Sequence, residues 1–182
     1  MPQTAPILTA NLCQYAELCP AQAELAHAFA SFAQAEPHAF ERSNLAGHFT
    51  GSAWVVSADG ERTLLMHHRK LDRWLQPGGH ADGDTDLARV ALREACEETG
   101  VVGLRSEGGI FDIDRHPIPA RGAEPAHWHH DVRYVVRAGA DERFVLNGES
   151  RALVWRSIVD VAADETLAAS LRRMARKWLA TR

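Results

Sequence analysis

The sequence predicts an α/β fold in which a mixed β-sheet lies between helices, preceded by a helical extension. Three observations support this expectation. Segments with the composition of β-strands come before and after one long helical segment in the sequence, at 48–58, 62–69, 108–115 and 127–137. That helical segment follows a glycine-rich loop, and a second one, 164–179, follows the last strands. Strands and helices in this order form a sheet whose faces are covered by helices.

The composition is that of a globular protein with one domain and an extension. The chain has 182 residues, of which 46% are hydrophobic, and a formal net charge of -4. This charge argues against a general nucleic-acid-binding surface, which would need clustered Lys and Arg. No stretch is long and apolar enough to span a membrane, and Cys13, Cys19 and Cys96 lack the spacing of a metal site. We therefore expect a soluble, cytoplasmic protein with reduced thiols, in which Cys96 is a small core residue.

Residues 1–45 are expected to form the helical extension and a linker, and residues 46–182 the main domain. From Asn11 to Ala35 the chain is rich in Ala, Gln, Glu and Leu, with apolar residues at roughly helical spacing. Pro20 is expected to begin the second of two helices, because proline is tolerated in a first turn. The extension would pack on the main domain or on the second subunit of a homodimer.

Two strands joined by a hairpin are expected next. The segment 48–58 is rich in Phe, Thr, Trp and Val, Asp59-Gly60 is a strong hairpin signal, and 62–69 forms the returning strand. Trp54 is expected in the core rather than in contact with a ligand.

A Gly/Pro loop, residues 76–79, leads through a polar turn into the long helical segment. No residue between Thr85 and Thr99 breaks a helix, and Gly100 is expected to end it. Either Asp84 or Thr85 is expected to be the N-cap, because a side-chain oxygen must accept the free N–H groups of the first turn.

Three glutamates lie on one face of this helix near its C-terminus. Glu94, Glu97 and Glu98 have the spacing i, i+3, i+4. Like charges at this spacing repel one another, and negative charge at a helix C-terminus opposes the helix dipole. A hard divalent cation would remove both penalties, and ligands that are all oxygen favour Mg²⁺ or Mn²⁺ over zinc. The alternative is a solvated acidic helix end, which is the commoner role of such runs.

The segment around these glutamates resembles the signature of the Nudix hydrolases, G-x5-E-x7-R-E-U-x-E-E-x-G-U, in which U is a bulky aliphatic residue. Ala95 is smaller than the expected aliphatic residue. The Glu expected six residues after the first glycine is replaced by Thr85, with Asp84 just before it. The residues that match are Gly79, Arg93, Glu94, Glu97, Glu98, Gly100 and Val101.

This resemblance implies the Nudix α/β/α sandwich with a mixed sheet, and a pyrophosphohydrolase that cleaves a diphosphate bond in a nucleoside diphosphate derivative or nucleotide. It implies Mg²⁺ or Mn²⁺ as cofactor. Glu97, Glu98 and the Gly79 carbonyl are implied metal ligands, and Glu98 is implied in catalysis. Glu94 is implied as ligand or general base, oriented by Arg93.

Residues 149–155 resemble a later Nudix segment, in which an acidic residue precedes a Trp-bearing strand that runs into a helix. The resemblance makes Glu149 the candidate for an additional metal ligand or base from outside the signature. The alternative is a glutamate on a surface loop.

The strand expected at 127–137 carries a polar row on one face. His127, His129, Asp131 and Arg133 alternate with residues that point to the other face. Such a row could bind a second metal, bind phosphate or line a wet face, since two histidines on one strand face can share a metal. His80 could join them or be an ordinary loop residue.

Substrate contacts are expected in loops outside the signature, at 69–73 and 115–130. The cations of the first loop could meet phosphates or could simply be solvated, and Trp74 or Trp128 could stack on a base. The expected partner is a small phosphorylated molecule derived from a nucleotide. The candidates for contact with it are Arg69, Arg73, Trp74, His127, His129 and Arg133.

Two other functions stay open at this point. A domain with this signature that has lost hydrolysis would act as a ligand sensor, and Thr85 in place of Glu is the feature that supports this alternative. An isopentenyl-diphosphate isomerase shares the fold and uses histidine-rich metal sites, which the His127/His129 pair resembles. It would need a catalytic cysteine ahead of the signature, and none lies between Cys19 and Cys96.

Overall fold

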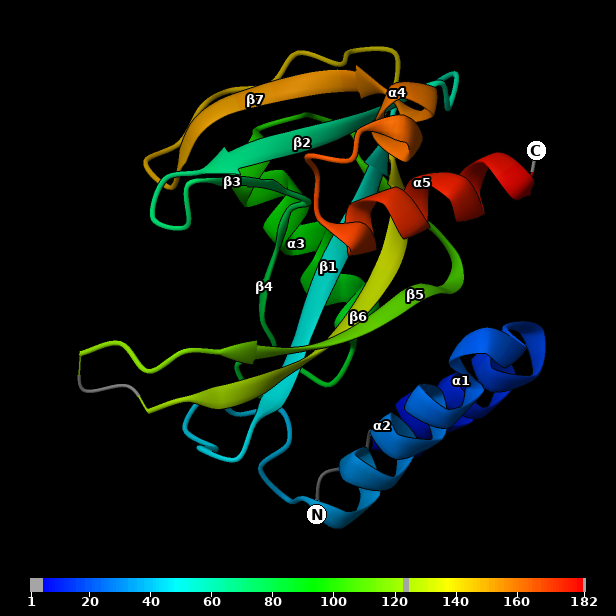
Figure 1. The fold of residues 1–182 in the computed structure, drawn as a ribbon, viewed down its shortest axis with the longest axis vertical. Coiled ribbons are helices and arrows are strands. Elements are labelled where there is room, and N and C mark those ends of the chain that lie inside the picture. Colours follow the sequence, from blue (N-terminus) through cyan, green and yellow to red (C-terminus); the bar gives the residue numbers. More distant parts are fainter. Residues whose placement is uncertain (1–4, 123–124, 182) are drawn as a thin grey trace.

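The protein folds around a mixed sheet of seven strands, as seen in a computed structural model that describes residues 5–122 and 125–181 (Figure 1). Five strands follow the order β3-β2-β1-β6-β5, while β4 pairs with β1 and β7 pairs with β2. The pair β1–β6 is parallel, and the other pairs are antiparallel. The strands are β1 (His48–Val56), β2 (Arg62–His68), β3 (Arg73–Leu75), β4 (Gly78–His80), β5 (Arg105–Ile118), β6 (His127–Arg137) and β7 (Ser150–Ser157).

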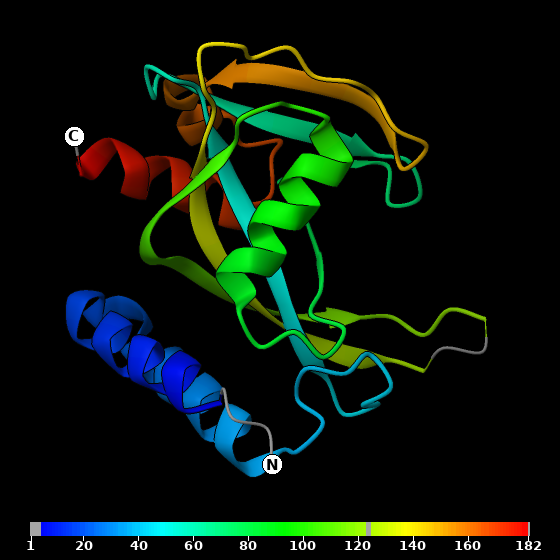
Figure 2. The same ribbon diagram turned by 180° about the vertical axis from the view of Figure 1, so that it is seen from behind.

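Helices cover both faces of this sheet, which confirms the expected α/β/α arrangement. Phe49 and Val55 of β1 join a core with α1, α2 and α3, whereas Trp54 and Val56 join a second core with α4 and α5. Alternate residues of one strand therefore serve opposite cores. Figure 1 shows α5 in front of the sheet, and Figure 2 shows α3 on the other side. The helices are α1 (Ala5–Leu18), the 3₁₀ turn η1 (Pro20–Gln22), α2 (Ala23–Ala35), α3 (Leu87–Thr99), α4 (Ile158–Ala163) and α5 (Ala169–Ala180).

The N-terminal helices pack on the main domain. Phe29 and Phe32 of α2 contact the ring of Phe49 in β1 and the ring of His130 in β6. Helix α1 begins earlier than the predicted Asn11, and Pro20 opens the 3₁₀ turn rather than α2 itself. Residues 1–4 of the predicted extension lie outside the described residues. The division at residue 45 and the homodimer stay predictions.

Helix α3 ends as predicted and begins two residues later than predicted. Gly100 adopts a left-handed conformation with φ of 65°, which ends the helix. The predicted N-cap at Asp84 or Thr85 is wrong, because the side chain of Asp86 accepts the Arg89 N–H at 3.1 Å. Cys96 is exposed, so its predicted place in the core is also wrong. The helix packs against the sheet on one face only, and Cys96 lies on the other.

Several segments differ from their predicted bounds. The end of the Gly/Pro loop forms strand β4, and β5 continues to Ile118 instead of ending at residue 115. The predicted final helix begins too early, because Asp164 accepts the Thr166 N–H at 3.0 Å in a turn ahead of α5. Residues 123–124 of the predicted loop lie outside the described residues. Within the part of the chain that the structure covers, no helix has the length and apolar character needed to cross a membrane.

Candidate functional site

The C-terminal half of α3 faces the glycines of β4. Glu98 is buried, at 6% exposure, and accepts a hydrogen bond from the Gly78 N–H at 2.8 Å. Glu94 is half-buried and Glu97 is exposed. The three glutamates predicted to share a helix face therefore run from the interior to solvent, with the most buried one held by the backbone of the glycine loop.

The carboxyl group of Glu98 is held in an unfavourable environment. Burial is the main reason that its pKa is raised to about 8, and the charges of Glu94, Glu149 and Glu97 raise it further, against the Gly78 hydrogen bond that lowers it. A buried carboxylate surrounded by carboxylates is costly unless a cation compensates it. This set of oxygen donors fits a hard divalent cation.

Gly79 leaves the space that Glu94 occupies. A Cβ atom at Gly79 would lie 2.5 Å from the carboxyl carbon of Glu94, so a larger residue there would displace this side chain. Arg93 holds Glu94 from the other side, because its guanidinium donates to Glu94 Oε1 at 2.8 Å and to the His80 carbonyl at 3.2 Å. The carboxylate of Glu94 is thus fixed between Gly79 and the guanidinium of Arg93.

The loop that carries Glu149 lies against the end of α3. Asn147 donates from its side chain to the Glu97 carbonyl at 3.3 Å, which anchors the loop to the helix. The guanidinium of Arg69 donates to the carbonyls of Gly148 at 3.0 Å and Ser150 at 3.3 Å. The structure thus brings the exposed Glu149 near the acidic cluster, and Arg69 holds its loop.

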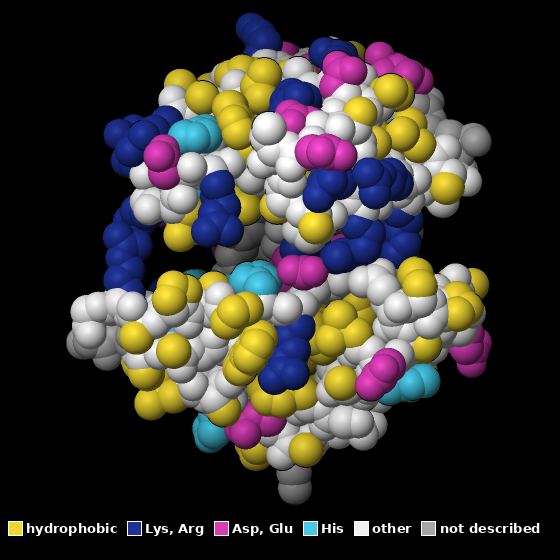
Figure 3. Space-filling model, in the orientation of Figure 1, with side chains coloured by type: hydrophobic (Ala, Val, Ile, Leu, Met, Phe, Trp, Pro, Cys, Tyr) yellow, Lys and Arg dark blue, Asp and Glu magenta, His cyan; other side chains and the backbone are white. Residues whose placement is uncertain are grey.

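Arg73 and Trp74 line a surface cavity of about 400 Å³ between β3 and the turn ahead of α5. The Trp74 ring is half-buried and meets the His67 ring edge-on, with centroids 5.0 Å apart. Arg73 is exposed. A hollow crosses the middle of the face in Figure 3, and Lys, Arg and His side chains border it together with acidic atoms. The other residues that line the cavity are His67, Asp72, Thr166, Leu167 and Ala168.

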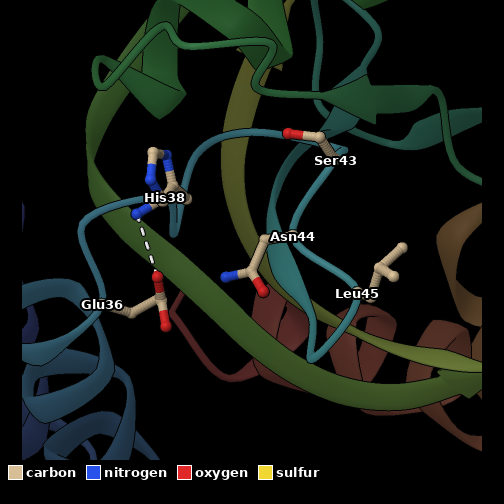
Figure 4. Close-up of a pocket in the computed structure, with 5 residues that line it drawn as sticks. All are labelled: Glu36, His38, Ser43, Asn44 and Leu45. Carbon is tan, nitrogen blue, oxygen red and sulfur yellow. Dashed lines mark hydrogen bonds between the residues drawn. The ribbon is translucent and has the colours of Figure 1, made fainter.

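A second cavity, of about 300 Å³, lies in the linker between α2 and β1 (Figure 4). It contains none of the predicted site residues. The Glu36 carboxylate accepts the His38 N–H at 3.1 Å, and the Asn44 side chain stands beside them. The residues that line it are Glu36, His38, Ser43, Asn44 and Leu45.

Arg133 is buried rather than open to a ligand. Its side chain is 3% exposed and pairs with Asp131 at 2.7 Å, with Asp112 at 3.2 Å and with Asp114 at 3.3 Å. Arg173 of α5 pairs with the same Asp112 at 2.7 Å. These ion pairs join β5, β6 and α5 beneath the surface and stabilise the charge of Arg133. Its contact with substrate stays a prediction.

Histidines gather at the other end of the polar row. One ring nitrogen from each of His48, His80 and His129 lies within 4.8 Å of the others. His127 also approaches His129, with 3.3 Å between their Nε2 atoms. Burial, followed by the neighbouring His80, lowers the pKa of His48 to about 4 and holds the pKa of His129 well below its ordinary value. The sequence prediction missed His48, since nothing near it in the sequence shows that β1 will lie parallel to β6.

Comparisons with known proteins identify the family and the fold. A family model described as the NUDIX domain matches residues 48–178. An Ap4A hydrolase of C. elegans in a binary complex superposes with a TM-score of 0.56 at 17% identity, covering 73% of this chain and 96% of that one. The MutT protein of Methanosarcina mazei Go1 superposes with a TM-score of 0.57 at 21% sequence identity, covering 74% of this chain and 94% of that one. The NUDIX domain of Shewanella oneidensis NrtR, complexed with ADP ribose, has a TM-score of 0.54 at 21% sequence identity, and the match covers 84% of this chain and 97% of that one.

Proposed function

The chain belongs to the Nudix hydrolase family, and on that premise we propose that it cleaves a diphosphate bond in a nucleotide-derived molecule with the help of Mg²⁺ or Mn²⁺. One observation carries this proposal: the buried Glu98 lies among carboxylates and accepts a hydrogen bond from the glycine loop. The Ap4A hydrolase and the ADP-ribose complex among similar structures support a substrate derived from a nucleotide.

In this proposal the acidic cluster holds the cation. Glu97, Glu98 and the Gly79 carbonyl are ligands, Glu149 is an additional ligand from the facing loop, and Glu94 is either a ligand or the base that accepts a proton from water. When bound, the cation would supply positive charge that neutralises phosphate and makes a water molecule more acidic.

The chain's own residues orient these groups. Arg93 holds the carboxylate of Glu94 through the 2.8 Å ion pair, which fixes where a proton from water would be received. The Gly78 N–H fixes one oxygen of Glu98 and leaves the other available. Positioning and charge stabilisation are the main contributions that a protein makes to phosphoryl transfer.

The cavity beside Trp74 is the proposed place for the rest of the substrate. Trp74 offers an aromatic face on which a base can stack, and the exposed Arg73 beside it offers a cation to phosphate. Trp128 is less suited, because the guanidinium of Arg115 already lies over its ring at 4.4 Å. His127 and His129 lie in the histidine group and are not placed in this cavity.

The Gly79→Ala variant should lose activity while it keeps its fold. The new Cβ would lie within 2.8 Å of all three carboxyl atoms of Glu94, and the flexible end of that side chain can move aside without disturbing the core. A displacement of about 1 Å at a reacting group can cost about 100-fold in rate. Steady-state kinetics and thermal unfolding measure the two effects. Gly109→Ala is the matched control, because its Cβ would meet nothing within 4 Å, and equal losses in both variants would contradict the role of Gly79.

The Trp74→Ala variant should raise KM and change kcat little. Stacking of a base on an aromatic ring contributes about 1–3 kcal/mol, so we expect KM to rise by about 5- to 150-fold. The matched control is Trp128→Ala, for which we expect the wild-type KM. A larger effect on KM at Trp128 would move the proposed base site to β6.

The general test is a panel of nucleoside diphosphate derivatives, dinucleoside polyphosphates and nucleoside triphosphates, incubated with Mg²⁺ or Mn²⁺. We expect metal-dependent cleavage of a diphosphate bond in at least one of them, with products identified by chromatography. Tight binding of a nucleotide without any cleavage across the panel would instead favour a ligand sensor.

A further inference from the structure

Three strands bring three histidines to one face of the sheet. His48 of β1 pairs directly with His129 of the parallel strand β6, and Thr50, two residues along β1, pairs with His80 of β4. Paired residues, and residues two apart in a strand, point to the same face. Gly79 faces the opposite side, where a Cβ would meet Glu94 of α3. The histidines therefore lie on the face away from the acidic cluster.

The ring nitrogens of these histidines are close enough to share one ion. One nitrogen from each ring lies within 4.8 Å of the other two, and the ring centroids are 4.9 to 5.1 Å apart. In a tetrahedral zinc site with Zn–N bonds of about 2.0–2.1 Å, ligand nitrogens lie about 3.3 Å apart. Small rotations of the rings would close the remaining gap.

The strongest evidence for a bound ion is a ring nitrogen of His48. Its side chain is 1% exposed, and its Nε2 atom has no hydrogen-bond partner among the described residues. A buried polar atom without a partner is costly. The Nδ1 atom lies 3.5 Å from the Asn44 carbonyl, which favours the tautomer that carries its proton on Nδ1 and a lone pair on Nε2. Metal-binding histidines are commonly oriented by such a second contact.

We propose that His48, His80 and His129 form a second metal site, for a borderline transition-metal dication with Zn²⁺ as the foremost candidate. Ligands that are all imidazole favour Zn²⁺ over Mg²⁺, which prefers oxygen. Three protein ligands leave a fourth position for water or another small ligand, as in catalytic zinc sites. The ring of His127 stacks on the ring of His48, with 5.0 Å between centroids. This proposal does not rest on the proposed hydrolase activity.

The test measures binding of the metal alone to the full-length protein after treatment with a chelator. Co²⁺ reports on coordination through its visible absorption, and Zn²⁺ is then titrated to displace it. We expect one equivalent of Co²⁺ with the spectrum of a four-coordinate site that has three imidazole ligands. His80→Ala removes a half-buried ligand, and we expect it to weaken Zn²⁺ binding by more than about 100-fold, since loss of a second-sphere contact alone costs about 10- to 100-fold.

Two variants separate this site from the acidic cluster. His27→Ala removes an exposed histidine of α2 and should leave Co²⁺ and Zn²⁺ binding unchanged. Glu98→Gln should also leave this binding unchanged, even though it is expected to abolish hydrolysis. His129→Ala, checked for folding by circular dichroism, should behave like His80→Ala. Binding that survives in both His80→Ala and His129→Ala, or that disappears in Glu98→Gln, would overturn the proposal, as would an absence of binding in the wild type.

Discussion

The Glu98→Gln variant is expected to retain its fold and to lose metal-dependent hydrolysis by about 1,000-fold or more, the upper range for removing one electrostatic group from an active site. Glutamine has the shape of glutamate, and its side-chain oxygen can still accept the Gly78 N–H. It lacks the charge that a divalent ligand set requires. The measurement is the rate of product release at saturating Mg²⁺ or Mn²⁺.

The same variant should be at least as stable as the wild type without added metal, because it removes a carboxylate that is buried among Glu94, Glu97 and Glu149. Thermal unfolding checks this expectation. Glu24→Gln is the matched control, since Glu24 is exposed on α2, and it should keep both activity and stability. Wild-type turnover in Glu98→Gln would remove this carboxylate from the proposed metal site.

The Arg133→Met variant is expected to be the most destabilised of those considered, by about 3–5 kcal/mol in the free energy of unfolding. Methionine fills much of the same volume but removes the ion pair of the buried Asp131, which is 2% exposed. It also removes one of the cations beside Asp112, which is 0% exposed and still pairs with Arg173. Removal of one partner from a buried ion pair leaves uncompensated charge, which costs more than the pair itself contributes. Urea unfolding monitored by circular dichroism measures the change.

Arg143→Met is the control for this prediction. Arg143 also pairs with an aspartate, Asp141, but its side chain is 89% exposed, so the change in unfolding free energy should stay within about 0.5 kcal/mol. The opposite result for Arg133→Met would support the contact with substrate that the sequence predicts. If Arg133→Met were as stable as the wild type and showed a raised KM, Arg133 would be a substrate-binding residue after all.

The strand β6 shows how much of the fold could be predicted. Its predicted bounds, 127–137, agree with the structure, and the predicted alternation places His127 and His129 together and turns His130 towards the phenylalanines of α2. The period of two that defines a strand is a local property of the sequence. The same pattern could not predict that Asp131 and Arg133 belong to a buried ion-pair network, whereas His129 belongs to a cluster of histidines.

Some features of the acidic cluster could likewise be predicted from the sequence, and others could not. Local rules were enough to predict one helix face with three glutamates and a glycine that ends the helix, because helical periodicity and a left-handed glycine depend only on neighbouring residues. They could not show that Glu98 is buried and Glu97 exposed. Nor could they place Asn147 and the loop of Glu149 against the end of the helix, 50 residues away in sequence.

By itself, the sequence determined the order of the main strands and helices, the signature of the family and the chemical type of the acidic cluster. The tertiary structure alone decided which carboxylate is buried, why Arg133 is enclosed and which histidines meet. The reason is physical: periodicity and caps arise from contacts between near neighbours, whereas burial and strand register arise from pairing across the sheet. The parallel pairing of β1 with β6, which sets His48 against His129, joins residues 81 positions apart, as the Thr50–Asp131 hydrogen bond beside them illustrates.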